Sequence, residues 1–201
     1  MKQRGALGLA ALACAVVCLL VSALAAGCAA PTPLPLPLPL PTTLPLLRLP
    51  PAALGPARYE LSQRLSVTPL ELSDASPQQV DVQLQLDASG LRLAGFAYGQ
   101  RVLLMQWDGA ALRLERHPRL PDEVDANRML RDLCLVFWPA EAVRAALPEG
   151  WHWVDANSVQ SLQQGDATWL TVRRSGQRIV EIINTAEGYR LLIESQPLEP
   201  S

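Results

Sequence analysis

Lysine is nearly absent from this 201-residue chain: Lys2 is the only one, and histidine occurs twice. Once the N-terminal signal discussed below is removed, 15 arginines face 19 acidic residues, so the net charge of the remainder is −4. Phosphate backbones are bound by clustered cations. We therefore expect no nucleic-acid partner.

Motifs that carry chemistry are also scarce. The sequence contains no nucleophile elbow, no dinucleotide-binding fingerprint and no phosphate-binding loop. His117 and His152 have no second ligand at metal spacing. Asp122, Glu123 and Asp125 lie at an expected helix start, where carboxylates cap amide groups more often than they hold a cation. We predict no catalytic residue, no metal and no cofactor, and hence a non-enzymatic function.

The N-terminus has the order of a secretory signal. Residues 1–27 carry two cations, then an apolar run, then small residues before Cys28. The run approaches the ~20 residues of a spanning helix, so an uncleaved anchor is the alternative. If Cys28 is modified, Cys134 has no partner, which excludes a disulfide framework and favours a buried, inert thiol.

The residues before Cys28, Ala25-Ala26-Gly27, resemble the bacterial lipoprotein signal, although Ala25 stands where leucine is commonest. The resemblance implies cleavage before Cys28, a diacylglycerol on its sulfur and an acyl group such as palmitate on its new amino group. Two acyl chains already suffice for stable anchoring. Ala29 follows in place of aspartate, which in such lipoproteins implies sorting to the outer membrane. We expect a lipid-anchored outer-membrane protein whose folded domain faces the periplasm.

Ten prolines, from Pro31 to Pro56, follow the cysteine. Proline at this density disfavours helices and central strands and favours extended polyproline II. We therefore predict that residues 28–56 are a lipidated cysteine with a Pro/Leu-rich tether, with a reach on the order of 80 Å. The leucines between the prolines are unusual for a solvated spacer and leave open a contact with a membrane or protein surface.

Residues 57–201 are expected to form the folded domain. Apolar and polar residues alternate along residues 80–93, and further strands are expected near residues 151–155, 159–163, 168–174, 178–184 and 189–194. In the middle, Asp125 caps a predicted helix that Pro139 ends, and a second short helix follows. The predicted fold is mainly β: an antiparallel meander curved into an incomplete barrel and lidded by an inserted helical pair.

Asp108-Gly109 is a strong hairpin signal, because both positions of a two-residue turn need positive φ. Such a turn would pair Trp107 with Ala110. It places five apolar residues on one face of the hairpin, and we expect them to line a ligand cavity: Leu103, Met105, Trp107, Leu112 and Leu114.

Two stretches, LLMQWDG (103–109) and LRDLCLVFWP (130–139), resemble a family of short, uncharacterised proteobacterial lipoproteins that are often encoded beside fatty-acid-synthase-like genes for aryl polyene lipids. No catalytic residue is assigned to that family, so none is carried over. The strand–helix–strand order is also similar to LolA and LolB, whose incomplete barrel holds lipoprotein acyl chains.

These resemblances imply a lipoprotein that shelters or transfers a lipid or acyl product in a concave apolar sheet. The alternative is a structural or interaction lipoprotein with a filled core that binds a protein partner of the cell envelope. The sequence leaves open the ligand, the partner, the direction of transfer and the oligomeric state.

Overall fold

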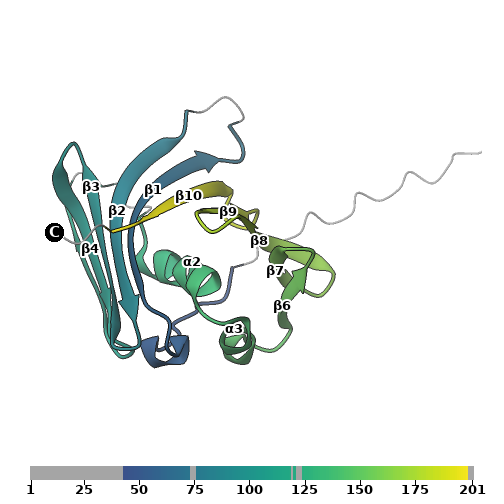
Figure 1. Cartoon of the computed structure of the whole chain (residues 1–201). Helices are drawn as coiled ribbons and strands as arrows, with labels where there is room; N and C mark the ends of the chain where they lie inside the picture. The colour runs from purple at the N-terminus through teal and green to yellow at the C-terminus, as the bar shows by residue number, and fades with distance from the viewer. Residues whose placement is uncertain (1–42, 73–75, 119, 121–123, 199–201) are drawn as a thin grey trace, which may run out of the picture. The chain divides into compact units, whose positions relative to one another are not determined.

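A single antiparallel sheet dominates the computed structural model, which describes residues 43–72, 76–118, 120 and 124–198 (Figure 1). In these residues ten strands lie in the order β5-β4-β3-β2-β1-β10-β9-β8-β7-β6. Their bounds are β1 (Tyr59–Pro69), β2 (Gln78–Asp87), β3 (Gly90–Ala97), β4 (Gln100–Trp107), β5 (Leu112–Arg116), β6 (Trp151–Ala156), β7 (Val159–Gln164), β8 (Ala167–Ser175), β9 (Ile179–Asn184) and β10 (Tyr189–Pro197). β5 and β6 are the two edge strands and do not pair with each other, so the curved sheet is not closed. The predicted antiparallel meander with an inserted helical pair is confirmed.

β1 joins the two halves of the sheet. It pairs with β2 on one side and with β10, the last strand, on the other, for example through Leu65 and Ile193. No pattern in the sequence predicted this strand, because its apolar positions are separated by Gln63 as well as by exposed polar residues. Gln63 is buried, and its amide donates to Ser195 Oγ at 2.9 Å, which satisfies a polar group on the inner face.

Two helices, α2 (Ala126–Phe137) and α3 (Ala140–Ala146), connect the edge strands β5 and β6. The connection must therefore span the width of the sheet, and Figure 1 shows α2 within the curve of the strands. Asp125 Oδ1 accepts from the amides of Asn127 and Arg128 at 2.8 and 2.9 Å, which confirms the predicted cap. Apolar residues of α2 join the same core as the inward-facing side chains of the sheet.

The N-terminal end of the described chain corrects the predicted domain boundary. Residues 43–54, here called the strap, end in a short 3-10 helix, η1 (Pro51–Leu54), and belong to the folded domain. Leu44, Leu47, Leu49 and Leu54 are at most 5% exposed. The tether expected over residues 28–56 was therefore wrong for its last part, because four of the five leucines in residues 43–54 are core residues. Residues 1–42, with the expected signal and the rest of the tether, lie outside the described residues.

The β4–β5 connection also differs from its prediction. Trp107 pairs with Leu112 rather than Ala110, and Met105 pairs with Leu114, so four residues form the loop. Asp108 Oδ1 accepts from the amides of Ala110 and Ala111 at 2.9 and 2.7 Å, which stabilises the wider turn. The shift is two residues, and side chains alternate with period two, so the apolar face is preserved.

Candidate functional site

An unbroken apolar row crosses the concave face of the sheet. The pairing register places in line, from β1 to β5, the residues Leu61, Leu84, Leu93, Met105 and Leu114. A second row runs beside it from Tyr59 to Leu112 and includes Trp107. Alternation along each strand produces both rows, because every second side chain points to the same face. The concave face is therefore a broad apolar surface that needs a cover.

The strap contributes part of that cover through hydrogen bonds to its backbone carbonyls. The Trp107 indole Nε1 donates to Leu49 O at 2.8 Å, and the Trp138 indole Nε1 donates to Pro50 O at 3.0 Å. The Cys134 thiol lies 3.8 Å from Leu47 O, a weaker contact. Trp107 belongs to β4, whereas Trp138 and Cys134 belong to the end and the interior of α2. The strap is thus held between the sheet and the helix.

Strap residues alternate between the core and solvent. Leu47 and Leu49 are buried in the core, whereas their neighbour Leu46 is 64% exposed. Among the described residues, no backbone hydrogen bond joins residues 43–49 to a strand. The strap is an extended Leu/Pro chain, and its carbonyls accept hydrogen bonds from indole groups. Proline-rich peptides bind in aromatic grooves in the same way. The strap therefore lies against the sheet in the manner of a bound peptide and not as an added strand.

A loop glycine makes room for the strap. Gly109, between β4 and β5, has φ of 93°, and a Cβ there would lie 3.2 Å from Pro51 Cδ. This glycine combines a left-handed backbone with a close approach, and both requirements favour glycine. The Asp108-Gly109 signal was therefore read correctly as a turn, and its contact with the strap was missed.

The five expected cavity residues are brought together, but in packed surroundings. Leu103, Met105 and Trp107 are 7%, 0% and 4% exposed, and Leu112 and Leu114 are half-buried against the same core. In the described part of the chain they contribute to a continuous apolar cluster that includes the strap. The open cavity expected over them is not what these residues form here, because the leucines of the strap fill that space. Cys28 and Ala29, the expected lipid-attachment and sorting residues, lie outside the described residues.

Of the other residues singled out by sequence, Asp122 and Glu123 lie outside the described residues, and Cys134 and Asp125 have structural surroundings. Cys134 is fully buried, and burial raises the pKa of its thiol to about 12, as expected of an inert thiol. Asp125 caps α2, and His152 is exposed on β6. Within the described ranges, no group of three or more His, Cys, Asp or Glu side chains could hold a metal ion.

A family model described as "Protein of unknown function (DUF3261)" matches residues 60–197. The chain belongs to the DUF3261 family. A search of curated proteins finds no match. The match begins after the strap, whereas Trp107 and Trp138, which donate to it, lie inside the matched range.

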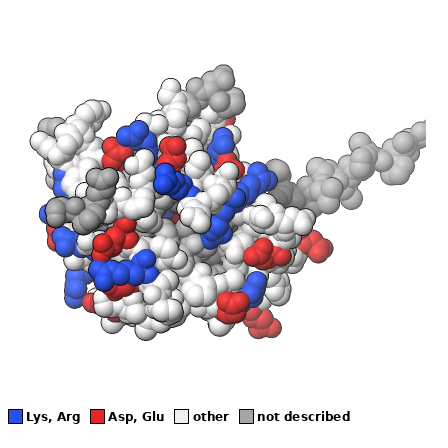
Figure 2. Space-filling view, in the orientation of Figure 1, with Lys and Arg blue, Asp and Glu red and all other residues white. Residues whose placement is uncertain are grey.

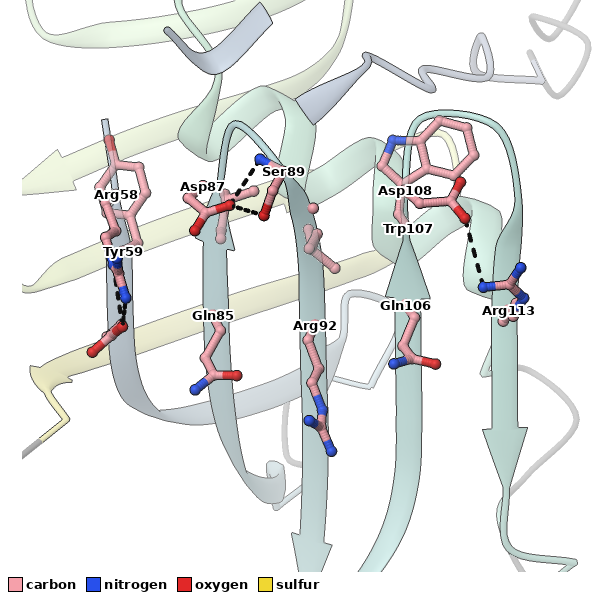
Figure 3. Close-up of a pocket in the computed structure, with 14 residues that line it drawn as sticks. Arg58, Tyr59, Gln85, Asp87, Ser89, Arg92, Gln106, Trp107, Asp108 and Arg113 are labelled. Atoms are coloured by element: carbon pink, nitrogen blue, oxygen red, sulfur yellow. Dashed lines mark hydrogen bonds and ion pairs between the residues drawn. The ribbon is translucent and has the colours of Figure 1, made fainter. Parts of the chain in front are cut away.

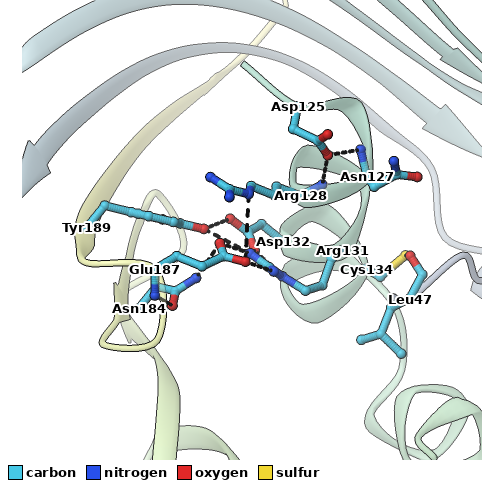
Figure 4. A network of polar contacts seen from close by, with 10 residues as sticks. All are labelled: Leu47, Asp125, Asn127, Arg128, Arg131, Asp132, Cys134, Asn184, Glu187 and Tyr189. Atoms are coloured by element: carbon cyan, nitrogen blue, oxygen red, sulfur yellow. Dashed lines mark hydrogen bonds and ion pairs between the residues drawn. The ribbon is translucent and has the colours of Figure 1, made fainter. Parts of the chain in front are cut away.

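A buried polar cluster fixes α2 of this DUF3261 protein to the turn between β9 and β10 (Figure 4). The Arg131 guanidinium donates to both carboxylate oxygens of Glu187, at 2.6 and 2.8 Å, and to Asp132 Oδ1 at 3.0 Å. The Tyr189 hydroxyl donates to Asp132 Oδ2. Asn184 donates to Glu187 Oε2 at 3.0 Å. Such a fully paired cluster specifies the position of α2, because any shift of the helix would break several of these bonds.

The ionisation of the cluster follows from burial and pairing. Burial lowers the pKa of Arg131, but the hydrogen bond that it donates to Glu187 and the charge of Asp132 outweigh this effect, so the pKa of Arg131 is raised. Burial raises the pKa of Asp132, against the opposing effect of Arg131. Burial and the charge of Asp132 raise the pKa of Tyr189, which keeps the hydroxyl proton. Burial would raise the pKa of Glu187, but the hydrogen bond from Arg131 lowers it. The cluster therefore contains a neutral donor, the Tyr189 hydroxyl, and paired charges, an arrangement suited to a structural role.

The outer face of the sheet carries a hollow of about 370 Å³ (Figure 3). A polar row of paired positions crosses it, from Gln85 through Arg92 and Gln106 to Arg113. Its lining contains three arginines and three carboxylates, so it has no net charge to select a charged ligand. Figure 2 likewise shows basic and acidic side chains interspersed over the face in view. The concave face is the stronger candidate in this DUF3261 protein.

No helix in the described part of this DUF3261 protein is long and apolar enough to cross a membrane.

Proposed function

We propose that this protein is a non-enzymatic lipoprotein, anchored in the outer membrane through Cys28, that shelters or transfers a lipid or acyl product on the concave face of its sheet. The proposed address rests on the lipoprotein-like residues before Cys28 and on Ala29 after it. The folded domain would face the periplasm.

One observation carries the ligand class: the concave apolar face is covered by elements that are not strands of the sheet. The strap and α2 supply this cover, and neither is hydrogen-bonded into the ladder among the described residues. Exchanging the strap, which is one part of this cover, for another apolar chain preserves every strand pair. Burial of an acyl chain would be favourable by about 0.8 kcal/mol per CH₂. The curved sheet can therefore hold a ligand with its strand pairing intact.

Native mass spectrometry tests this proposal directly. The mature chain with Cys28→Ser, exported without its own lipid, would be purified from its cells without detergent. We expect a co-purifying species with the mass of a fatty acid or an acylated compound, released when the protein unfolds. A spectrum that contains only the bare chain, together with failure to take up added fatty-acyl probes, would contradict the proposal.

A filled core favours the second candidate, a structural or interaction lipoprotein that binds a protein partner of the envelope. Met105, Leu84 and Leu130 are each 0% exposed, as in an ordinary packed domain. Under this reading the strap is permanent core and the working surface lies elsewhere. Cross-linking in cells would then recover a protein on the outer face, and the purified domain would contain no lipid.

A further inference from the structure

Two indole N–H groups in an otherwise apolar groove mark the chemistry of its occupant. Trp107 in β4 and Trp138 at the end of α2 donate to the consecutive carbonyls of Leu49 and Pro50. Both tryptophans are 4% exposed, so each N–H needs an acceptor whenever the groove is occupied. A purely hydrocarbon occupant would leave both donors unpaired.

The strap meets this demand with a particular arrangement of groups. Its apolar side chains, Leu44, Leu47 and Leu49, enter the core, and its carbonyls meet the indoles. Pro45, Pro50 and Pro51 have no N–H, so three of the eight residues from 44 to 51 bring no backbone donor that needs a partner. An extended apolar chain with carbonyl oxygens that accept from the indoles shares these groups with an acyl ester or amide.

We propose that the strap occupies the place of the ligand: an acyl ester or amide displaces residues 44–51, its chain takes the place of the leucines, and its carbonyl oxygen, which has two lone pairs, accepts from Trp107 and Trp138. This inference rests on the proposed function and specifies its ligand class. From residue 44 to residue 51 the strap extends on the order of 22 Å at the polyproline II rise, a length suited to a long acyl chain.

The outer side of the strap offers a place to lock it. Arg48 Nη2 donates to Asn127 Oδ1 at 2.6 Å, so strap and α2 meet at two exposed side chains. In Arg48→Cys/Asn127→Cys, on the unlipidated Cys28→Ser chain, a bifunctional methanethiosulfonate linker would join the two positions and reduction would release them. Arg48→Cys alone and Asn127→Cys alone, treated with the same linker, are the matched controls.

Two probes then read the site: a fluorescent fatty-acyl ester and the matched alkyl ether, which lacks the carbonyl. We expect the ester to bind about tenfold more tightly than the ether, because the ester carbonyl is a stronger acceptor for a buried indole N–H than the ether oxygen. Locking the strap should weaken ester binding at least tenfold, and reduction should restore it. Trp138→Phe should lower the preference for the ester, whereas Trp153→Phe, at an equally buried tryptophan with no hydrogen bond to the strap, should keep it.

The outcomes separate this inference from the function on which it rests. If both probes bind equally and the lock has no effect, the lipid-binding function stands and the displacement of the strap by the ligand is refuted. If neither probe binds, both are refuted.

Cys134 reports strap release without any ligand, because its buried thiol lies against Leu47 O. Locking should slow its labelling by a maleimide, and equal labelling rates would contradict a strap that leaves the groove.

Discussion

The neighbouring leucines Leu46 and Leu47 test whether the strap is core. Leu47 is 1% exposed and Leu46 is 64% exposed, although both stand in the same Pro/Leu-rich stretch. Truncating a buried leucine to alanine removes its burial energy and leaves a cavity, at a cost of about 2–5 kcal/mol. Truncating an exposed leucine away from special features changes stability by less than about 0.5 kcal/mol. The two residues have the same side chain and differ in its burial.

Urea unfolding of the unlipidated mature chain, followed by tryptophan fluorescence, would measure both variants. With a slope of about 2 kcal/mol per M, a loss of about 3 kcal/mol for Leu47→Ala lowers the midpoint by roughly 1.5 M. Leu46→Ala should leave the midpoint nearly unchanged. Equal midpoints for the wild type and both variants would show that residues 43–54 are a solvated tether, and the strap account would be refuted.

Four further predictions follow from the packing and from the proposed address. Trp107→Ala should lower the free energy of unfolding by about 3–5 kcal/mol in the same assay, and a loss below ~1.5 kcal/mol would indicate an open cavity instead. The control Tyr98→Ala, at a fully exposed aromatic residue, should change stability little. Arg131→Ala should cost about 3–5 kcal/mol, because it leaves buried carboxylates without their cation. Cys28→Ser should abolish incorporation of labelled palmitate, and equal labelling of wild type and variant would instead support an uncleaved anchor. Ala29→Asp should retain the protein in the inner membrane on density fractionation, unless the wild type already fractionates there.

Alternation and turn chemistry made most of the sheet predictable. The strands after residue 150 follow from period-two patterns between turns, most of which contain glycine. Asp125 and Pro139 delimit α2 through capping and loss of an N–H. The β4–β5 register was missed by two residues, because Asp108 closes a wider turn by accepting two amides, a choice that the dipeptide alone does not specify.

The parts of the candidate site that were missed depend on contacts distant in sequence. Proline density correctly indicated extended chain over the strap, yet the same conformation serves a solvated tether and a docked peptide. The leucines between the prolines were the available signal, and only the distant indoles of Trp107 and Trp138 distinguish the two. The pairing of Arg131 with Glu187 joins residues 56 positions apart, and no local pattern announces it.

Photolabelling tests the central claim, an acyl chain on the concave face, most directly. A fatty-acyl ester with a diazirine on its chain would be irradiated with the unlipidated mature protein, and the modified peptides would be identified by mass spectrometry. The account predicts insertion into inward-facing residues such as Leu93, Met105 and Leu130, with competition by unlabelled ester. Insertion confined to the outer face around Arg92 and Gln106, or none that competes, would contradict it.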